Sequence, residues 1–169
     1  MLETFLELLE ESYYEVGFAF EGLEDDHVWR RPAEGLLSVG ELAGHIAYWE
    51  AVKLAGDGGG TGSDLANCRV AGPLIDRRFR YYPALTATPL SEQQLAMTTG
   101  QVREELLRVH REAVAHFRTL SPDLESPVPG WPPGFTYGAV LKYASFHVAY
   151  HTGQMYSARH LLGEETPEN

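Results

Sequence analysis

Apolar residues in the first third of the chain recur every three or four positions, which is the spacing of an amphipathic helix. This pattern predicts a first helix from about Leu2 to Gly22. A second helix is expected to begin after Ser38 and Glu41, whose spacing forms a capping box that satisfies exposed backbone donors. It ends at the glycine-rich run 56–60. The apolar stripes of the two helices are Phe5, Leu9, Tyr13, Val16 and Phe20, and Leu42, His45, Trp49 and Val52.

Two further helices are expected in the second half of the chain. A second capping box, at residues 91–94, opens the third helix, which ends before Pro122 because proline cannot continue a helix. Thr136 is a suitable N-cap for the fourth helix, which runs to about Leu162 and closes at Gly163. No alternation is long enough to predict a β-strand. The apolar stripe of the third helix is Leu95, Val102, Leu106, Val109, Ala113 and Leu120.

Four long amphipathic segments in one chain predict an all-α fold, namely a four-helix bundle. The connection between the second and third helices, residues 56–90, is far longer than an antiparallel hairpin requires. A connection of this length can cross the bundle, and it allows the two helices to run parallel. Residues 1–163 are expected to form a single domain, followed by a short acidic tail at 164–169.

The long connection contains a basic segment, residues 77–82, on an otherwise acidic chain. Its simpler interpretation is a loop that packs on the bundle and leaves its arginines solvated. The alternative is a cover over a functional site that supplies cations for an anionic substrate. Arg77, Arg78 and Arg80 are also the candidate anchors for the carboxylate of a cofactor.

Composition limits the classes of function. The 169 residues include 24 acidic and 13 basic side chains, and the resulting net charge of −11 disfavours nucleic acid as a partner. No apolar run is long enough to span a membrane, and the first residues carry acids where a signal peptide carries bases. A soluble cytoplasmic protein is therefore expected. The single cysteine, Cys68, excludes an internal disulfide and a cysteine-rich zinc site.

Three histidines interrupt the apolar stripes and are the candidate metal ligands. His147 and His151 are four residues apart, so they lie one turn apart on the same face of a helix. His45 interrupts the stripe of the second helix. A lone histidine in such a position is usually a hydrogen-bonded core residue, but burying three imidazoles without partners is costly, and one shared ion satisfies all three. The other four histidines, including His110 on the charged third helix, are expected to be ordinary.

Two common helical metal motifs do not fit these histidines. A zincin protease needs a glutamate directly after the first histidine of its motif, and that position is Val148 here. Carboxylate-bridged di-iron bundles use Glu-x-x-His pairs, and none of the three histidines belongs to one. The pattern therefore predicts a mononuclear site with nitrogen ligands only.

Two motifs far apart in the chain together resemble a known family. The first is Trp-Arg-Arg-Pro at 29–32 with Ser-Val-Gly-Glu-Leu at 38–42 and His45, and the second is His-x-x-x-His-x-Gly-Gln at 147–154. In this combination the chain resembles the DinB/YfiT-like metalloenzyme family, over nearly its whole length. The resemblance implies a four-helix bundle and a homodimer. Large apolar residues on more than one face of the first helix agree with the homodimer.

The same resemblance implies a metal cofactor. In the family a triad of histidines binds a divalent ion, zinc or nickel, and by motif position the triad corresponds to His45, His147 and His151. Gln154 matches a glutamine that often follows the histidine pair without being a ligand, and Gly153 is expected to allow close helix approach. Some relatives use low-molecular-weight thiols, as transferases or isomerases, and others are hydrolases.

Three nitrogen ligands leave one position of a tetrahedral ion open, which is typical of catalytic sites. An ion there acidifies either a thiol, for S-transfer, or a water, for ester or amide hydrolysis. Thiol-dependent transfer is favoured because no further histidine or carboxylate lies within one turn of His147 or His151, although Glu50 and Tyr13 can approach from other helices. The alternatives are a metal-dependent hydrolase and a non-catalytic metal-binding stress protein.

Overall fold

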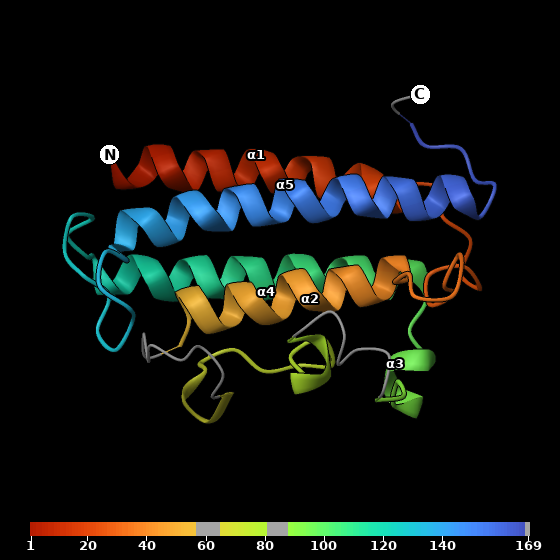
Figure 1. Ribbon diagram of the computed structural model, residues 1–169, viewed down its shortest axis with the longest axis horizontal. Coiled ribbons are helices and arrows are strands. Elements are labelled where there is room, and N and C mark those ends of the chain that lie inside the picture. Colours follow the sequence, from red (N-terminus) through yellow and green to blue (C-terminus); the bar gives the residue numbers. More distant parts are fainter. Residues whose placement is uncertain (57–64, 81–87, 168–169) are drawn as a thin grey trace.

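The computed structural model describes residues 1–56, 65–80 and 88–167, and its regular elements are all helices (Figure 1). Within these residues there is no β-strand, only an isolated bridge between Pro127 and Thr136, so the predicted all-α class is confirmed. No helix in this part of the chain combines the length and hydropathy that crossing a lipid bilayer requires. The elements are α1 (Leu2–Phe20), α2 (Val39–Leu54), η1 (Leu65–Asn67), η2 (Arg77–Phe79), α3 (Glu92–Leu95), α4 (Thr99–Leu120) and α5 (Tyr137–Leu161), where η marks a 3-10 helix.

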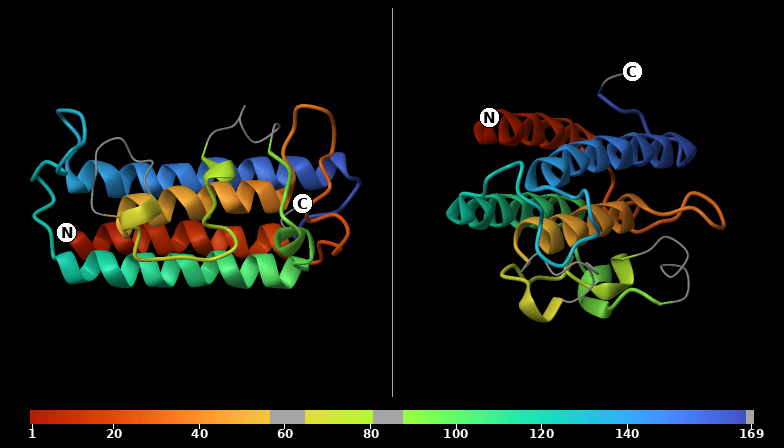
Figure 2. Two further views of the ribbon diagram at one scale, coloured as in Figure 1. Left: turned by 90° about the horizontal axis from the view of Figure 1, so that it is seen from below. Right: turned by 60° about the vertical axis from the view of Figure 1, so that its left-hand side comes forward.

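Four long helices lie side by side and form the bundle (Figures 1 and 2). The helix α1 packs mainly on α5, and α2 packs on both α4 and α5. Figure 1 shows that α1 and α5 run in one direction and that α2 and α4 run in the other. The parallel arrangement of α2 and α4, which the long connection allows, is therefore present. Part of that connection, residues 57–64 and 81–87, lies outside the described residues, and so do Tyr81 and Tyr82 of the basic segment.

The first helix buries most of its predicted stripe. Leu9, Tyr13, Val16 and Phe20 are buried, whereas Phe5 is only partly covered. Two large residues of α1, Leu8 and Tyr14, are exposed on other faces of the helix. The homodimer stays a prediction.

The prediction of where the third long helix begins is wrong. Its capping box at 91–94 is formed, but it opens only the four-residue helix α3, and the chain breaks before α4. The break has one local and one long-range cause. Thr98 and Gln101 form another capping box, and the carbonyl of Met97 accepts a hydrogen bond from Nε1 of the distant Trp29 at 3.1 Å. Leu95 is consequently 55% exposed and does not belong to the core stripe, and Leu120 at the other end of α4 is exposed as well.

The first family motif builds the start of α2. Ser38 and Glu41 form the predicted capping box. Arg31 donates hydrogen bonds to the Glu41 carboxylate, the shortest from Nη2 at 2.6 Å and from Nε at 2.9 Å. The ring of Trp29 packs on the backbone of Gly40, where an added Cβ would lie 2.5 Å from it. These residues therefore fix the fold around α2 and are not part of the candidate metal centre.

The helix α5 begins and ends as predicted, and the chain beyond it folds back on the bundle. Thr136 caps the Ala139 N–H at 3.2 Å, and Gly163 adopts a φ of +82°, which a residue with a side chain rarely reaches. The buried guanidinium of Arg159 donates to the carbonyl of Glu21 at 2.8 Å and to that of Glu165 at 2.6 Å. The first residues of the acidic tail are thus tied to the end of α1.

Candidate metal centre

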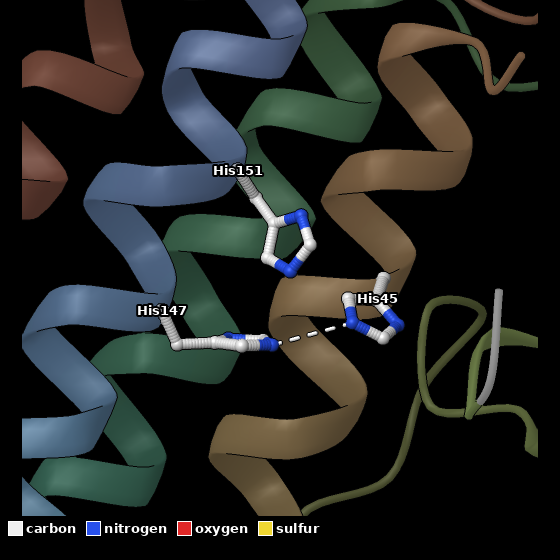
Figure 3. Close-up of side chains that lie close together, drawn as sticks. All are labelled: His45, His147 and His151. Atoms are coloured by element: carbon white, nitrogen blue, oxygen red, sulfur yellow. Dashed lines mark hydrogen bonds between the residues drawn. The ribbon is translucent and has the colours of Figure 1, made fainter.

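The helices α2 and α5 bring the three predicted histidines together (Figure 3). His45 comes from α2, and His147 and His151 come from successive turns of α5. All three side chains are largely buried, and one nitrogen from each lies within 4.8 Å of the others. Among the described residues, this is the cluster of histidine, cysteine or acidic side chains with the spacing of a metal site.

Hydrogen bonds at the outer nitrogens fix which nitrogen faces the centre. The Nδ1 of His45 lies 2.7 Å from the carbonyl oxygen of Phe79, and the Nδ1 of His151 lies 2.7 Å from Gln154 Oε1. Both acceptors require Nδ1–H as the donor, so Nε2 of each ring carries a lone pair. Figure 3 shows these nitrogens pointing into the space between the rings. Such outer partners are the usual means of orienting a metal-bound imidazole.

The distances and the protonation states also fit a metal ion. The Nε2 atoms of His45 and His147 are 3.2 Å apart, close to the roughly 3.3 Å between two ligands of a tetrahedral zinc ion. Burial, followed by the charge of His151, lowers the pKa of His45 to about 4, and burial lowers that of His147 to about 2. Burial likewise lowers the pKa of His151. All three imidazoles are therefore neutral at pH 7, which is the form that binds metal.

The carbonyl that orients His45 is held in place by close packing on α2. Phe79 is fully buried, and its ring lies so near Gly44 that an added Cβ would be 2.7 Å from it. The preceding residue, Arg78, is also buried, and its Nη2 lies 3.7 Å from Glu41 Oε1. The short helix η2 is thus fixed on both sides, by Gly44 through Phe79 and by Glu41 through Arg78.

Substituting Gly44 by alanine is expected to weaken metal binding by about 10- to 100-fold, the usual cost of losing an outer hydrogen-bond partner of a ligand. The new methyl group displaces the Phe79 ring, and the carbonyl of Phe79 then no longer orients His45. Competition with a chromophoric zinc chelator measures the affinity. Gly153→Ala is the matched control, because nothing lies within 4 Å of a Cβ at that position of α5. Wild-type affinity in Gly44→Ala would contradict this role of Phe79.

The empty space around Gly153 also corrects an expectation from the sequence. A glycine in this motif was expected to allow close helix approach, but Gly153 is exposed and faces no other helix within contact distance. The neighbouring Gln154 has the clearer role, because its side chain binds His151.

The three imidazoles form part of the wall of a cavity of about 650 Å³. Lys53 lies in this wall, with Nζ 4.1 Å from the centroid of the Tyr143 ring. Burial lowers the pKa of Lys53 to about 7, only partly offset by Glu50. Lys53 is not among the residues predicted from the sequence, although His45, Trp49 and Lys53 are spaced by four residues and so share a face of α2. Besides the three histidines and Lys53, the wall residues are Trp49, Arg80, Trp131, Phe135, Val140, Tyr143, Phe146 and Tyr150.

The three arginines of the basic segment occupy different environments. Arg80 lines the cavity, Arg78 is buried against Glu41, and Arg77 is exposed. The interpretation of this segment as a loop with solvated arginines is therefore wrong for Arg78, because its neighbour Glu41 supplies a buried partner charge. Binding of an anionic cofactor stays a prediction, and Arg80 is the arginine placed to perform it.

Glu50 and Tyr13, the two groups considered as bases from other helices, are bonded to each other elsewhere in the core. The hydroxyl of Tyr13 donates to Glu50 Oε2, and His110 Nδ1 donates to Glu50 Oε1 at 2.6 Å. The rings of Tyr13 and His110 stack with centroids 3.7 Å apart. His110 is only 2% exposed, so treating it as an ordinary histidine of a charged helix was wrong. The sequence did carry a signal of its burial, because His110 follows the stripe residue Val109 and lies one turn from the stripe residues Leu106 and Ala113.

The fold and this cluster define a class of protein, a helical bundle whose buried three-histidine group fits a metal site. The family model described as the DinB superfamily matches residues 8–155, and the chain therefore belongs to this superfamily. No significant match was found among curated proteins or among solved structures.

Proposed function

We propose that this protein is a thiol-dependent S-transferase that holds one zinc or nickel ion through His45, His147 and His151. The observation that carries the proposal is that these imidazoles form part of the wall of the 650 Å³ cavity. A ligand in the cavity therefore meets the position that three protein nitrogens leave open. The proposal includes a cytoplasmic homodimer with a small-molecule substrate, which the acidic composition and the exposed Leu8 and Tyr14 support.

A divalent ion bound there supplies one effect, which is to lower the pKa of a thiol and favour its thiolate form. The chain supplies the rest. Lys53 Nζ, whose pKa of about 7 leaves it partly uncharged at neutral pH, can accept the proton from the thiol. The sulfur electron pair then forms a bond to an electrophilic carbon, and the leaving group departs with the electrons of its own bond.

Thiol transfer is preferred to hydrolysis because the described cavity wall contains no aspartate or glutamate to serve as base for a water. One observation favours the hydrolase as the second candidate, since a partly uncharged Lys53 can also take a proton from water. The two reactions differ in whether they require a thiol.

Cobalt-loaded protein is expected to develop a thiolate-to-cobalt charge-transfer band when a small thiol is added at millimolar concentration. Binding should release a proton, and the apparent pKa of the thiol should fall below its usual value of about 8.5. Absorption spectroscopy with a parallel pH titration measures both effects.

The thiol experiment is performed in a Cys68→Ser background, so that the chain's own thiol cannot give the signal. Cys68 does not belong to the described cavity wall, and burial raises its pKa, so the substitution should leave the site unchanged. If no band appears, the transferase proposal is abandoned. Ester cleavage without thiol, rising with pH near neutrality, would instead support the hydrolase. A band without turnover of any electrophile would support a non-catalytic metal-binding protein.

A further inference from the structure

The wall of the cavity beside the three histidines consists mostly of flat aromatic faces that come from three parts of the chain. Tyr143, Phe146 and Tyr150 follow one face of α5, and the rings of Phe146 and Tyr150 are stacked with centroids 6.0 Å apart. Trp131 and Phe135 come from the connection before α5, with centroids 5.4 Å apart, and Trp49 comes from α2. A flat unsaturated ligand can stack on such faces, which favour offset and edge-to-face contacts.

Two of these rings sit in a connection that hydrogen bonds hold in shape. The Val128 N–H donates to the carbonyl of Phe135 at 2.9 Å, and the Trp131 N–H donates to that of Val128 at 3.2 Å. The bridge between Pro127 and Thr136 closes the same connection against the start of α5. Trp131 and Phe135 are therefore held at the cavity by the backbone, so that little ordering is needed when a ligand binds.

The exposure of these aromatic side chains needs an explanation on a strongly acidic protein. Phe146 is 62% exposed and Tyr150 is 54% exposed, although both border the same cavity. Contiguous exposed apolar surface of this kind usually marks a binding site. Because these rings surround the metal centre, the simplest occupant is a ligand of that centre.

The charge of the cavity is opposite to that of the protein as a whole. The chain has a net charge of −11, yet the described cavity wall contains Arg80 and Lys53 and no acidic residue. An arginine keeps its charge at all physiological pH values and binds planar anions through several donors. A divalent ion at the histidines would add positive charge. The wall therefore attracts an anion and would disfavour a cation.

We infer that the electrophile handled at this site is an aromatic or other flat conjugated anion, whose ring stacks between α5 and the 127–136 connection and whose acidic group meets Arg80. The inference rests on the proposed function in taking the cavity as the substrate site. It goes beyond it by naming the class of substrate, which combines a flat apolar body with a negative charge.

Binding of 2-naphthalenesulfonate to the zinc-loaded protein without thiol tests this inference. A sulfonate is a weak metal ligand, so its affinity reports the cavity wall and not coordination. Methyl 2-naphthyl sulfone is the neutral counterpart, and octanesulfonate is the anion without a ring. Quenching of tryptophan fluorescence follows the titration, because Trp49 and Trp131 both line the cavity. We expect the naphthyl anion to bind at least about tenfold more tightly than either comparison compound.

Substitutions assign the preference to particular residues. Arg80→Met is expected to remove most of the advantage of the sulfonate over the sulfone, and Arg80→Lys should keep much of it. Arg69→Met is the matched control, because Arg69 is an exposed arginine of the same connection that does not line the cavity. Phe135→Leu should reduce the advantage of the naphthyl anion over octanesulfonate.

Equal affinity for the sulfonate and the sulfone would overturn the inference, and so would an equal loss in Arg69→Met and Arg80→Met. These results are separable from those of the thiol experiment. A thiolate band together with no preference for the naphthyl anion overturns the substrate class alone. Tight binding of that anion without a thiolate band keeps the aromatic anion site and removes the transferase reaction.

Discussion

The His147→Ala protein is expected to lose its divalent ion, from about one per chain in the wild type to almost none after dialysis. Two imidazoles remain in the variant, and the loss of a ligand itself should exceed the about 10- to 100-fold effect of losing an outer partner. The Nε2 of His147 lies 3.2 Å from that of His45, so its removal opens the centre of the cluster. Elemental analysis of the dialysed proteins measures the metal content.

A second readout separates lost binding from lost folding. Zinc at 100 times its dissociation constant should stabilise the wild type by about 2.7 kcal/mol and so raise its thermal midpoint. The thermal midpoint of His147→Ala should stay unchanged. His160→Ala is the matched control, since His160 is an exposed histidine on the same helix that contacts Thr166. Equal metal content in the wild type and in folded His147→Ala would refute the assignment of this ligand.

The His110→Ala protein is expected to be less stable than the wild type by about 3–5 kcal/mol, which is the usual cost of leaving one partner of a buried ion pair alone. In the variant, Glu50 would still accept the hydrogen bond from the Tyr13 hydroxyl but would lose the hydrogen bond from His110 Nδ1. Chemical denaturation of the metal-free protein measures this loss. His116→Ala on the same helix is the control, and replacing His110 and Glu50 together by apolar residues should recover much of the stability.

The pH dependence of that stability has a defined sign. Burial lowers the pKa of His110, but the carboxylates of Glu50 and Glu10 outweigh burial and raise it overall. The contribution of the charged imidazole is therefore complete below the unfolded-state pKa of about 6.5, and it is lost as the pH rises through the higher folded-state value. A His110→Gln variant should lack this decline. An identical pH profile in the variant and the wild type would show that His110 is not a charged partner of Glu50 and Glu10.

Most helix ends could be predicted from the sequence because they depend on neighbouring residues. The Ser38 capping box, the Thr136 cap and the stop at Gly163 all involve residues within a few positions of one another. The error at α3 has the same local character, since two capping boxes follow each other closely and the second one starts the long helix. The contact of Trp29 with Met97, which joins residues far apart in the chain, also favours the break.

The sequence by itself also determined which three histidines are candidate metal ligands. An imidazole that interrupts an apolar stripe is expected to be buried, and a buried imidazole needs a partner. Only the tertiary structure decided what surrounds them. The carbonyl of Phe79 carries no signal in its residue type, and Lys53 and Arg80 reach the same cavity only because α2 and the connection after it fold against α5. His110 was misjudged for the same reason: the charges that hold it, Glu50 and Glu10, come from other helices. Periodicity reports which face of a helix is buried, whereas the partners of a buried polar group depend on how the helices pack.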